Sequence, residues 1–350
     1  MTTVFLTHPP DKLAQYYGPR AVAALQAIAD VRFNPELREL TIDELVAAAR
    51  DCHLMIGYRN TPGSARLFRE LPVLAAFMRC AIDISTVDVA AASASGVLVT
   101  QASAGFVAAV SEWVIAAMIA LGRGIVGHAE AYHRDGTAVS AMGRELRGST
   151  IGVIGYGRIA RSVCDLARAF GMRVVVAAPE TIAEADDVEQ VPLDALLATS
   201  HFVVCLAISN ADTRDLLDAA AFGRMAPGSF FVNASRGELV DEAALLAALE
   251  SGHLGGAALD VGRAPDQMPS PALARHPRVI ATPHIGGLTL PAIEHQSMET
   301  VSQVETLMRG AMPVGAVNVA HATRIRQWPA FSPAASTSAS TSKPISGESP

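Results

Sequence analysis

The amino-acid sequence predicts an α/β protein with two doubly wound domains, each a parallel sheet covered by helices on both faces. Apolar, strand-like segments alternate with helical segments in two separate series along the chain, a pattern typical of this architecture. The 350 residues exceed the usual size of a single hydrophobic core, and 50% of them are hydrophobic. Residues 150–177 combine a strand, a glycine turn, a helix and a second strand in direct succession. These observations favour two α/β domains over one.

The first series of elements occupies the N-terminal part of the chain. Apolar strands are expected at 4–7, 53–57, 74–79 and 97–100. Helical periodicity separates these strands, for example at 20–29 and 42–50. The N-terminal segment therefore has the composition of a first strand, and it lacks the basic region of a signal peptide.

The second series follows a long helical stretch at 108–133 and a glycine-containing loop at 136–148. Its strands are expected at 150–154, 173–177, 201–206, 229–233, 256–259 and 278–281. Beyond Trp328 the chain is rich in Ser, Thr, Ala and Pro, a composition that cannot bury enough apolar surface to fold. We therefore expect residues 329–350 to form a disordered tail.

The glycine turn at 155–160 predicts nucleotide binding. Gly155 permits a tight turn, Gly157 lets a pyrophosphate approach the backbone, and the small Ala160 lets helix and strand pack closely. The phosphates would sit at the N-terminus of the helix, beside Arg158 and Ile159, where unpaired N–H groups and the helix dipole favour negative charge. The alternative is a glycine turn that serves packing alone.

The net charge, the spacing of the histidines and the length of the apolar stretches argue against binding of nucleic acid, metal and membrane. A net charge of -7 and a pI near 5.8 give no electrostatic reason to bind nucleic acid. His128 and His133 lie five residues apart, which does not place them on one helical face, so no metal site is expected. The most apolar stretch, 113–121, is too short to span a membrane.

The cysteine pattern favours a reducing compartment. The four cysteines are scattered through apolar runs without paired spacing, and they are expected to be buried thiols: Cys52, Cys80, Cys164 and Cys205. Together with the missing signal peptide and membrane span, this predicts a cytoplasmic protein.

Five segments, taken in order, resemble the D-isomer-specific 2-hydroxyacid dehydrogenase family. They are Gly-Ser-Thr-Ile-Gly-Val-Ile-Gly-Tyr-Gly-Arg-Ile-Ala at 148–160, Met-Ala-Pro-Gly at 225–228, Val-Asn-Ala-Ser-Arg-Gly-Glu-Leu-Val-Asp-Glu at 232–242, Ala-Leu-Asp-Val at 258–261 and Thr-Pro-His-Ile-Gly-Gly at 282–287. Their order and spacing match the family over roughly residues 75–320. The resemblance implies an NAD(P)-dependent oxidoreductase acting on CH–OH donors.

The resemblance also implies the domain arrangement. A Rossmann-type dinucleotide-binding domain, 101–289, would be inserted in a discontinuous, flavodoxin-like substrate domain formed by 1–100 and 290–325. Helices at 112–122 and 291–309 would cross beside the two hinges. The family further implies a homodimer, formed largely through the nucleotide domain and its long helix.

The chemistry implied is hydride transfer between a nicotinamide and C2 of a small 2-hydroxy or 2-oxo acid. It requires a cation for the carboxylate, a proton donor or acceptor for the oxygen, and a fixed nicotinamide. Arg236 matches the family arginine, whose planar fork suits a carboxylate. His284 matches the family acid/base, since imidazole titrates nearest neutrality. Asp260 matches the residue that holds the nicotinamide carboxamide.

The glycine turn and the resemblance together assign the cofactor contacts. They are Gly155, Gly157, Arg158, Ile159, Ala178, Ala234, Ser235, Asp260, His284, Gly286 and Gly287.

Three departures from the family pattern leave questions open. Ala178 stands where an acid normally binds the adenosine ribose, and no arginine follows it, so NAD and NADP both remain candidates. NAD is slightly favoured because Glu180 contributes negative charge nearby. The glycine-rich substrate cradle appears as Ala-Ile82-Asp83, with an acid in place of the second glycine.

Ile82, Asp83 and Arg236 are the candidate substrate-binding residues. A carboxylate at Asp83 would repel an anionic substrate unless it is paired or protonated. A substrate bearing a hydroxyl or an amine is the alternative.

The third departure concerns the glutamate that normally orients the histidine. Ala264 stands at its position, and Asp266 is the nearest carboxylate. Asp266 is either a substitute partner of His284 or a solvated turn residue. We therefore predict a 2-hydroxyacid dehydrogenase with Arg236, His284 and Asp266 as catalytic residues. The alternatives are a catalytically silent NAD(H)-sensing protein on the same fold and a dehydrogenase of a one-carbon or inorganic anion; the sequence does not identify the substrate.

Overall fold

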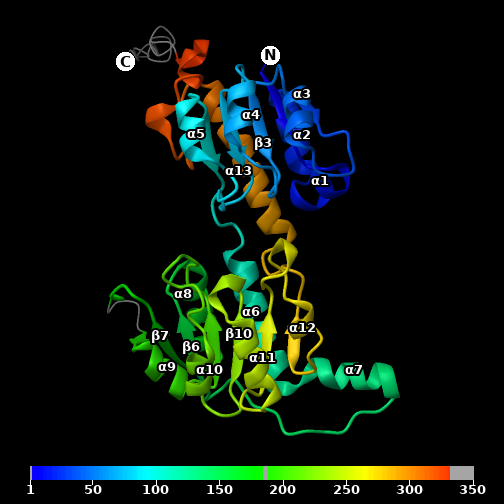
Figure 1. Ribbon diagram of the computed structural model, residues 1–350, viewed down its shortest axis with the longest axis vertical. Coiled ribbons are helices and arrows are strands. Elements are labelled where there is room, and N and C mark those ends of the chain that lie inside the picture. The colour runs from blue at the N-terminus through cyan, green and yellow to red at the C-terminus, as the bar shows by residue number, and fades with distance from the viewer. Residues whose placement is uncertain (1, 184–187, 332–350) are drawn as a thin grey trace, which may run out of the picture. The chain divides into compact units, whose positions relative to one another are not determined.

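The computed structural model describes residues 2–183 and 188–331, and the chain divides into two compact units (Figure 1). Unit 1 comprises Met1–Gly105 and Leu290–Pro350, and unit 2 comprises Phe106–Thr289. Each unit contains one parallel sheet, of five strands in unit 1 and seven in unit 2. The predicted fold class, two doubly wound parallel-sheet domains, is confirmed.

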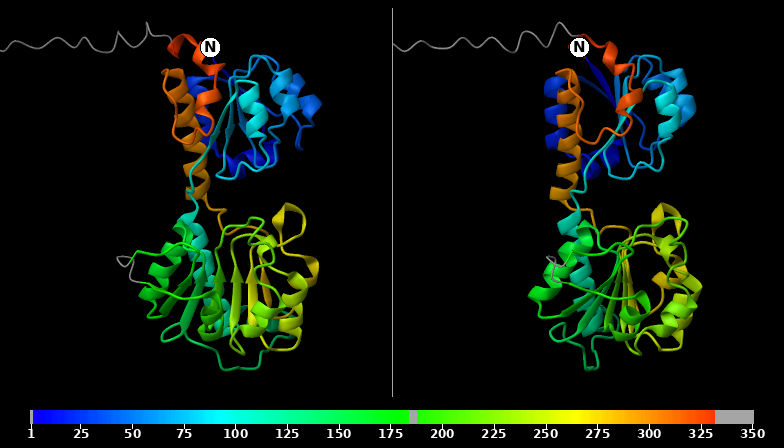
Figure 2. Two further views of the ribbon diagram at one scale, coloured as in Figure 1. Left: turned by 60° about the vertical axis from the view of Figure 1, so that its left-hand side comes forward. Right: turned by 90° about the vertical axis from the view of Figure 1, so that its left-hand side faces the viewer.

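Unit 1 has the strand order β2-β1-β3-β4-β5, which is the flavodoxin-like order. Its strands are β1 (Thr3–Leu6), β2 (Asp30–Phe33), β3 (Leu54–Gly57), β4 (Ala76–Arg79) and β5 (Leu98–Gln101). Its helices are α1 (Pro10–Tyr16), α2 (Pro19–Ile28), α3 (Ile42–Ala48), α4 (Ala65–Glu70), α5 (Val89–Ala94) and α13 (Leu290–Met308). Helices α2 and α13 lie on one face of the sheet, and α3 and α4 lie on the other (Figure 2). Alternate residues of β1 are buried against these two faces: Val4 and Leu6 pack with α2 and α13, whereas Phe5 packs with α3 and α4.

Unit 2 has the strand order β12-β11-β10-β9-β6-β7-β8, in which the direction of winding reverses between β6 and β9. Its strands are β6 (Thr150–Ile154), β7 (Arg173–Ala177), β8 (Glu189–Gln190), β9 (Phe202–Cys205), β10 (Phe230–Asn233), β11 (Gly256–Leu259) and β12 (Val279–Ala281). Its helices are α6 (Val107–Arg123), α7 (Ile125–Asp135), α8 (Arg158–Ala169), α9 (Leu193–Thr199), α10 (Ala219–Arg224), α11 (Glu242–Glu250) and α12 (Pro271–Ala274). Helices α6 and α8 pack on one face of the sheet, and α9, α10 and α11 on the other.

The strands expected from the sequence form within one or two residues of their predicted bounds. The edge strands β2 and β8 were not predicted. β2 carries Asp30 and Arg32 and is only half-buried, and β8 has two exposed residues, so neither has an apolar run. Of the predicted tail, Pro329–Phe331 forms a short 3-10 turn, and 332–350 lie outside the described residues.

The long helical stretch expected at 108–133 is formed by two helices, α6 and α7. Gly124 adopts a left-handed conformation with φ of 62°, which ends α6 and starts α7. In the described part of the chain no single helix is long and apolar enough to cross a membrane. Only α6 and α7 together meet that length and composition, and they are bent by 63°.

The cysteines are thiols, and no disulfide joins them within the described residues. Cys52, Cys164 and Cys205 are buried as predicted, whereas Cys80 is partly exposed. Burial raises the pKa of the Cys164 and Cys205 thiols to about 12, so both remain protonated at neutral pH.

His8, just after β1, is a neutral histidine in the core of unit 1. Its side chain is buried between the rings of Tyr17 and Tyr58, at centroid distances of 5.3 and 5.2 Å. Its Nδ1 has no hydrogen-bond partner among the described residues. Burial, together with the nearby charge of Arg79, lowers the pKa of His8 from 6.5 to about 3. The His8 ring is therefore neutral in the folded protein at neutral pH.

We expect His8 to make unit 1 acid-sensitive. Between pH 6.5 and about 3 the unfolded chain binds a proton at His8 that the folded chain does not, so stability falls as the pH falls. The loss is at most about 1.4 kcal/mol per pH unit. His8→Phe should therefore lose less thermal stability than wild type between pH 7.5 and 5. The exposed control His133→Asn should follow wild type, and an unchanged pH dependence in His8→Phe would contradict the assignment.

Candidate active site

Most of the predicted site residues follow strands of unit 2 at their carboxyl ends. In a parallel sheet these ends lie along one side, called here the carboxyl edge, where α/β proteins bind ligands. The residues that follow β6, β7, β10, β11 and β12 at this edge are Gly155, Ala178, Arg236, Asp260 and His284.

Gly155 is required by the fold itself. Its φ is +92°, and a Cβ there would lie 2.7 Å from the Leu206 carbonyl oxygen and 2.8 Å from the Ala207 Cα. The turn after β6 thus passes directly against the residues after β9, at the point where the winding of the sheet reverses. No other residue type fits this turn without displacing the backbone of the neighbouring strand.

Gly157, in contrast, is not required by the fold. Its φ is -78°, which any residue adopts, and no heavy atom of the described structure beyond its own neighbours lies within 4 Å of a Cβ placed there. The N-terminus of α8 begins at the next residue and has no side-chain cap. An open glycine beside uncapped N–H groups fits a pyrophosphate, which a side chain at Gly157 would displace.

The loop after β7 is held by one amide side chain. Gln190 of β8 donates from Nε2 to the carbonyl oxygens of Ala178 (3.0 Å) and Glu180 (2.8 Å), and its Oε1 accepts the N–H of Ile182 (2.9 Å). This loop carries no carboxylate at Ala178, and the Glu180 side chain is exposed. Sequence analysis missed Gln190, because a polar residue in a two-residue strand gives no periodic signal.

Asp260 follows β11, and its side chain is buried at 3% exposure. Its Oδ1 accepts hydrogen bonds from Thr282 Oγ1 (2.6 Å) and Ile285 N (2.8 Å), and its Oδ2 accepts one from Gly286 N (2.7 Å). A carboxylate accepts about four such bonds, and three of these positions at Asp260 are taken by described residues. Asp260 therefore fixes the loop that carries His284.

The backbone of His284 is held in an uncommon conformation, with φ of +55°. Its N–H donates to the Thr282 carbonyl oxygen at 2.9 Å. Gly286 permits the close approach of this loop, because a Cβ there would lie 2.8 Å from Asp260 Oδ2. Strained backbone of this kind is found where the surrounding structure fixes a side chain for function.

Arg236 follows β10 in a loop with its own hydrogen bonds. The Ser235 hydroxyl donates to the Ala207 carbonyl oxygen (2.5 Å), and the Ser235 N–H donates to Asn233 Oδ1 (3.1 Å). Asn233 Nδ2 donates in turn to the Arg236 carbonyl oxygen at 3.0 Å. The half-buried Arg236 guanidinium donates to the Ser235 carbonyl oxygen at 2.8 Å. These bonds hold the backbone of Ala234, Ser235 and Arg236 beside the glycine turn.

The segment after Asp260 turns at Pro265–Gln267, a short 3-10 helix. Ala264, at the position of the family glutamate, donates its N–H to the Met268 carbonyl oxygen at 3.0 Å. Asp266 lies in this turn, and its side chain is outside the described part of the structure. Among the described residues no group of three or more His, Cys, Asp or Glu side chains could hold a metal ion.

The candidate substrate residues of unit 1 lie just after β4. Ile82 is 39% exposed, and Asp83 Oδ1 accepts the N–H of Ser85 at 2.8 Å. The buried Arg79 donates from Nε to the Asp83 carbonyl oxygen (3.1 Å) and from Nη1 to those of Tyr58 and Thr61. Burial lowers the pKa of Arg79 to about 10, and the Asp83 charge opposes this shift. The carboxylate of Asp83 thus lies beside a buried cation.

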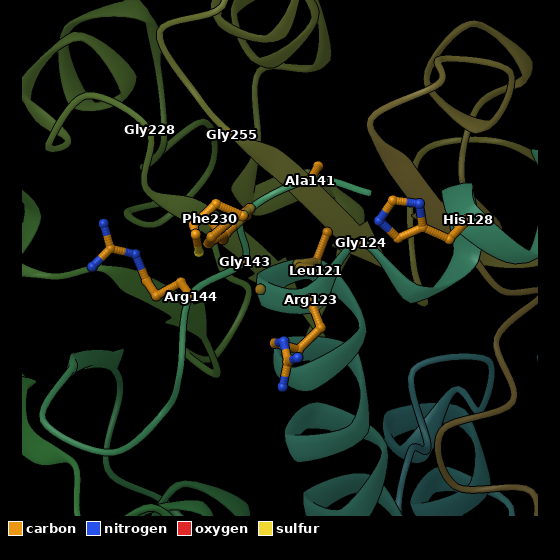
Figure 3. Close-up of a pocket in the computed structure, with 12 residues that line it drawn as sticks. Leu121, Arg123, Gly124, His128, Ala141, Gly143, Arg144, Gly228, Phe230 and Gly255 are labelled. Carbon is orange, nitrogen blue, oxygen red and sulfur yellow. The ribbon is translucent and has the colours of Figure 1, made fainter. Parts of the chain in front are cut away.

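A separate hollow of about 560 Å³ opens in unit 2 at the amino ends of β10 and β11, opposite the carboxyl edge of that sheet. Its lining includes Arg123, Arg144, His128 and Phe230 (Figure 3). The side chains of Arg123 and Arg144 point in different directions in Figure 3, so they do not converge on one ligand. The hollow lies where α6 ends and α7 begins, beside the loop that follows α7.

Comparison with known proteins assigns this arrangement to a class. Residues 115–286 match the family model described as "D-isomer specific 2-hydroxyacid dehydrogenase, NAD binding domain". The chain is 34% identical over 317 residues to D-3-phosphoglycerate dehydrogenase of Mycobacterium tuberculosis, covering 88% of this chain and 58% of that protein. It is 32% identical over 302 residues to (S)-sulfolactate dehydrogenase of Chromohalobacter salexigens, covering 83% and 94%.

Solved structures agree with this assignment. The apo-structure of D-lactate dehydrogenase from Escherichia coli has a TM-score of 0.76 and 26% identity, covering 91% of this chain and all (100%) of that one. A glyoxylate reductase from Paecilomyes thermophila, at 23% identity and a TM-score of 0.77 over 91% and 99%, shares the fold. The fold is shared with these solved structures. The chain belongs to the D-isomer-specific 2-hydroxyacid dehydrogenase family, and it spans 58% of the length of the mycobacterial D-3-phosphoglycerate dehydrogenases that it matches.

Gly157 and Gly155 give a paired test of dinucleotide binding. Gly157→Asp should fold normally, since φ is ordinary and the site is open. Its carboxylate would, however, occupy the space of the pyrophosphate and repel its negative charge. We expect it to abolish the rise in melting temperature that NAD(H) gives wild type by mass action. Gly155→Ala should instead destabilise the protein without ligand. Equal thermal shifts in wild type and Gly157→Asp would remove the assigned cradle.

Proposed function

We propose that the protein is an oxidoreductase that transfers hydride between a nicotinamide cofactor and C2 of a small 2-hydroxy or 2-oxo acid. The observation that carries the proposal is the carboxyl edge of unit 2, where the open Gly157, the Arg236 loop and the loop of His284 fixed by Asp260 follow strands of one parallel sheet. The named activities of the relatives, which act on phosphoglycerate and sulfolactate, are consistent with it.

Arg236 is proposed to bind the substrate carboxylate. A guanidinium offers paired donors that match a carboxylate, and its charge also polarises the adjacent carbonyl. A bound nicotinamide supplies or accepts the hydride at C2. The Asn233 and Ser235 hydrogen bonds support this role, because they fix the backbone from which Arg236 extends.

His284 is proposed as the acid/base. In reduction it donates a proton to the carbonyl oxygen, and in oxidation it accepts the hydroxyl proton. A nearby carboxylate would favour its protonated form at neutral pH. We propose Asp266 for this role, because Ala264 carries no carboxyl group and Asp266 is two residues away on the same turn.

The substrate is proposed to contact unit 1 through Ile82 and Asp83. Arg79 supports an anionic substrate despite Asp83, since its buried charge offsets the carboxylate. We propose unit 1 as the substrate domain and unit 2 as the dinucleotide domain. NAD is slightly favoured over NADP, because the exposed Glu180 adds negative charge to the loop at Ala178.

We also propose a cytoplasmic homodimer. Helix α7 has no buried residue, and the segment from 125 to 142 exposes four large apolar side chains: Ile125, Tyr132, Val139 and Met142. Apolar side chains gathered on one projecting segment favour a protein partner, and the family supports a second copy of this chain. The thiol state of the four cysteines supports a reducing compartment.

A catalytically silent NAD(H)-binding protein on the same fold is the second candidate. The observation that favours it is Ala264, which leaves no carboxylate at the position of the family glutamate. This protein would bind cofactor through the Gly157 cradle and turn over no substrate. A dehydrogenase of a one-carbon or inorganic anion remains an alternative outcome of the assay below.

The assay supplies NADH or NADPH with a panel of 2-oxo acids, plus NAD or NADP with formate and phosphite, and follows nicotinamide absorbance.

His284→Ala and Arg236→Ala should each lower turnover by roughly two to four orders of magnitude, and His284→Ala should still bind cofactor. In Asp266→Asn, the rate of 2-oxo acid reduction should begin to fall at a lower pH than in wild type, because His284 would lose its proton at a lower pH. Rates near wild type in either alanine variant would contradict the assignment, and cofactor binding without turnover would favour the silent protein.

A further inference from the structure

Arg263, in the loop after β11, contacts the loop that carries Arg236. Arg236 immediately precedes the 3-10 turn Gly237–Leu239. The Arg263 guanidinium donates from Nε to the Gly237 carbonyl oxygen (3.3 Å) and from Nη2 to that of Glu238 (3.2 Å). The Arg263 N–H donates to Glu242 Oε1 at 3.0 Å. Arg263 thus bonds the turn at two points directly beyond Arg236, and it bonds the first residue of α11, Glu242, at a third.

Asp215 completes this contact from a third segment. Its Oδ1 forms an ion pair with Arg263 Nη2, and its own N–H donates to the Glu238 carbonyl oxygen at 2.9 Å. Asp215 has φ of +53°, so its backbone is held in a conformation that a non-glycine residue rarely adopts. The Glu238 carbonyl oxygen is therefore bonded by both Asp215 and Arg263.

The two loops also touch through their backbones. A Cβ at Gly237 would lie 2.2 Å from the carbonyl carbon and oxygen of Gly262, and a Cβ at Gly262 would lie 2.6 Å from the Cα of Pro269. The loop after β11 therefore packs directly against the loop after β10. Gly262 and Arg263 belong to the segment in which this chain departs from the family pattern.

We propose that Arg263 is a positioning residue that sets the direction of Arg236. It acts through the carbonyl groups of Gly237 and Glu238, and its charge is directed to Asp215 instead of to substrate. The inference rests on the proposed function, in which Arg236 binds the substrate carboxylate. Removal of Arg263 leaves Arg236 present but loosely directed.

The test compares Arg263→Ala and Arg263→Lys with wild type in 2-oxo acid reduction. Both should raise the KM for the 2-oxo acid roughly 10- to 100-fold, the range expected for loss of precise orientation. Lysine keeps the charge opposite Asp215 but lacks the fork, so it should restore thermal stability without restoring KM. The coenzyme-induced thermal shift should stay at the wild-type value in both variants.

A matched control and a double variant separate positioning from general support. Arg278→Ala removes another arginine that donates to two carbonyl oxygens, those of Leu249 and Leu254, at the amino side of the sheet. It should lower stability without raising KM. In the Arg236→Ala background, Arg263→Ala should cause no further loss of kcat/KM. An unchanged KM in Arg263→Ala, or an additive loss in the double variant, would overturn the proposal.

Amide hydrogen exchange keeps this test distinct from the proposed function. The Val240 N–H donates to the Gly237 carbonyl oxygen at 3.1 Å, so its exchange reports on the turn that Arg263 holds. We expect faster exchange at Val240 in Arg263→Ala and wild-type exchange in Arg278→Ala. Faster exchange in a protein that turns over no substrate would support the contact and reject the function, whereas unchanged exchange would reject the contact itself.

Discussion

The buried carboxylate of Asp260 is the interaction on which the carboxyl edge of unit 2 depends. It takes three hydrogen bonds from the loop after β12, which lets His284 keep a left-handed backbone at the end of an adjacent strand. Loss of one of these donors would leave part of a buried charge without a hydrogen bond. The folded state would then be less stable, because the charge has been removed from water without full compensation. The same residue that is proposed to hold a carboxamide thus also fixes the loop of His284, the proposed acid/base.

Close backbone approach explains most of the glycines at this edge. Gly155, Gly237, Gly262 and Gly286 each stand where a Cβ would meet another atom within 2.8 Å. Gly157 stands apart, because nothing in the described structure occupies the space that its side chain would fill. The fold therefore accounts for these four glycines, and the open space at Gly157 supports the proposal that a pyrophosphate binds there.

Periodicity predicted the fold well because buried parallel strands are continuous apolar runs. The strands β6, β7 and β11 have the bounds expected from the sequence. It failed where burial is low, as in β2 and β8, and at Gly124, where one left-handed residue divides an otherwise helical pattern. The family motifs named Arg236, Asp260 and His284, whose proposed roles await the experiments above. The contacts of Arg263 and Asp215 could not be predicted from the sequence. Arg263 bonds backbone carbonyl groups, and Asp215 lies in a loop that is distant along the chain.

The role of Asp260 in holding the loop of His284 is tested most directly by amide hydrogen exchange at Ile285 and Gly286 in wild type and Asp260→Ala. Both N–H groups donate to Asp260, so they should be protected in wild type. In Asp260→Ala they should exchange roughly 10- to 100-fold faster, corresponding to about 1–3 kcal/mol for a lost hydrogen bond to a buried charge. The amides of β6 and β9 should keep their wild-type exchange. Equal exchange at Ile285 and Gly286 in the two proteins would show that another interaction holds the loop of His284.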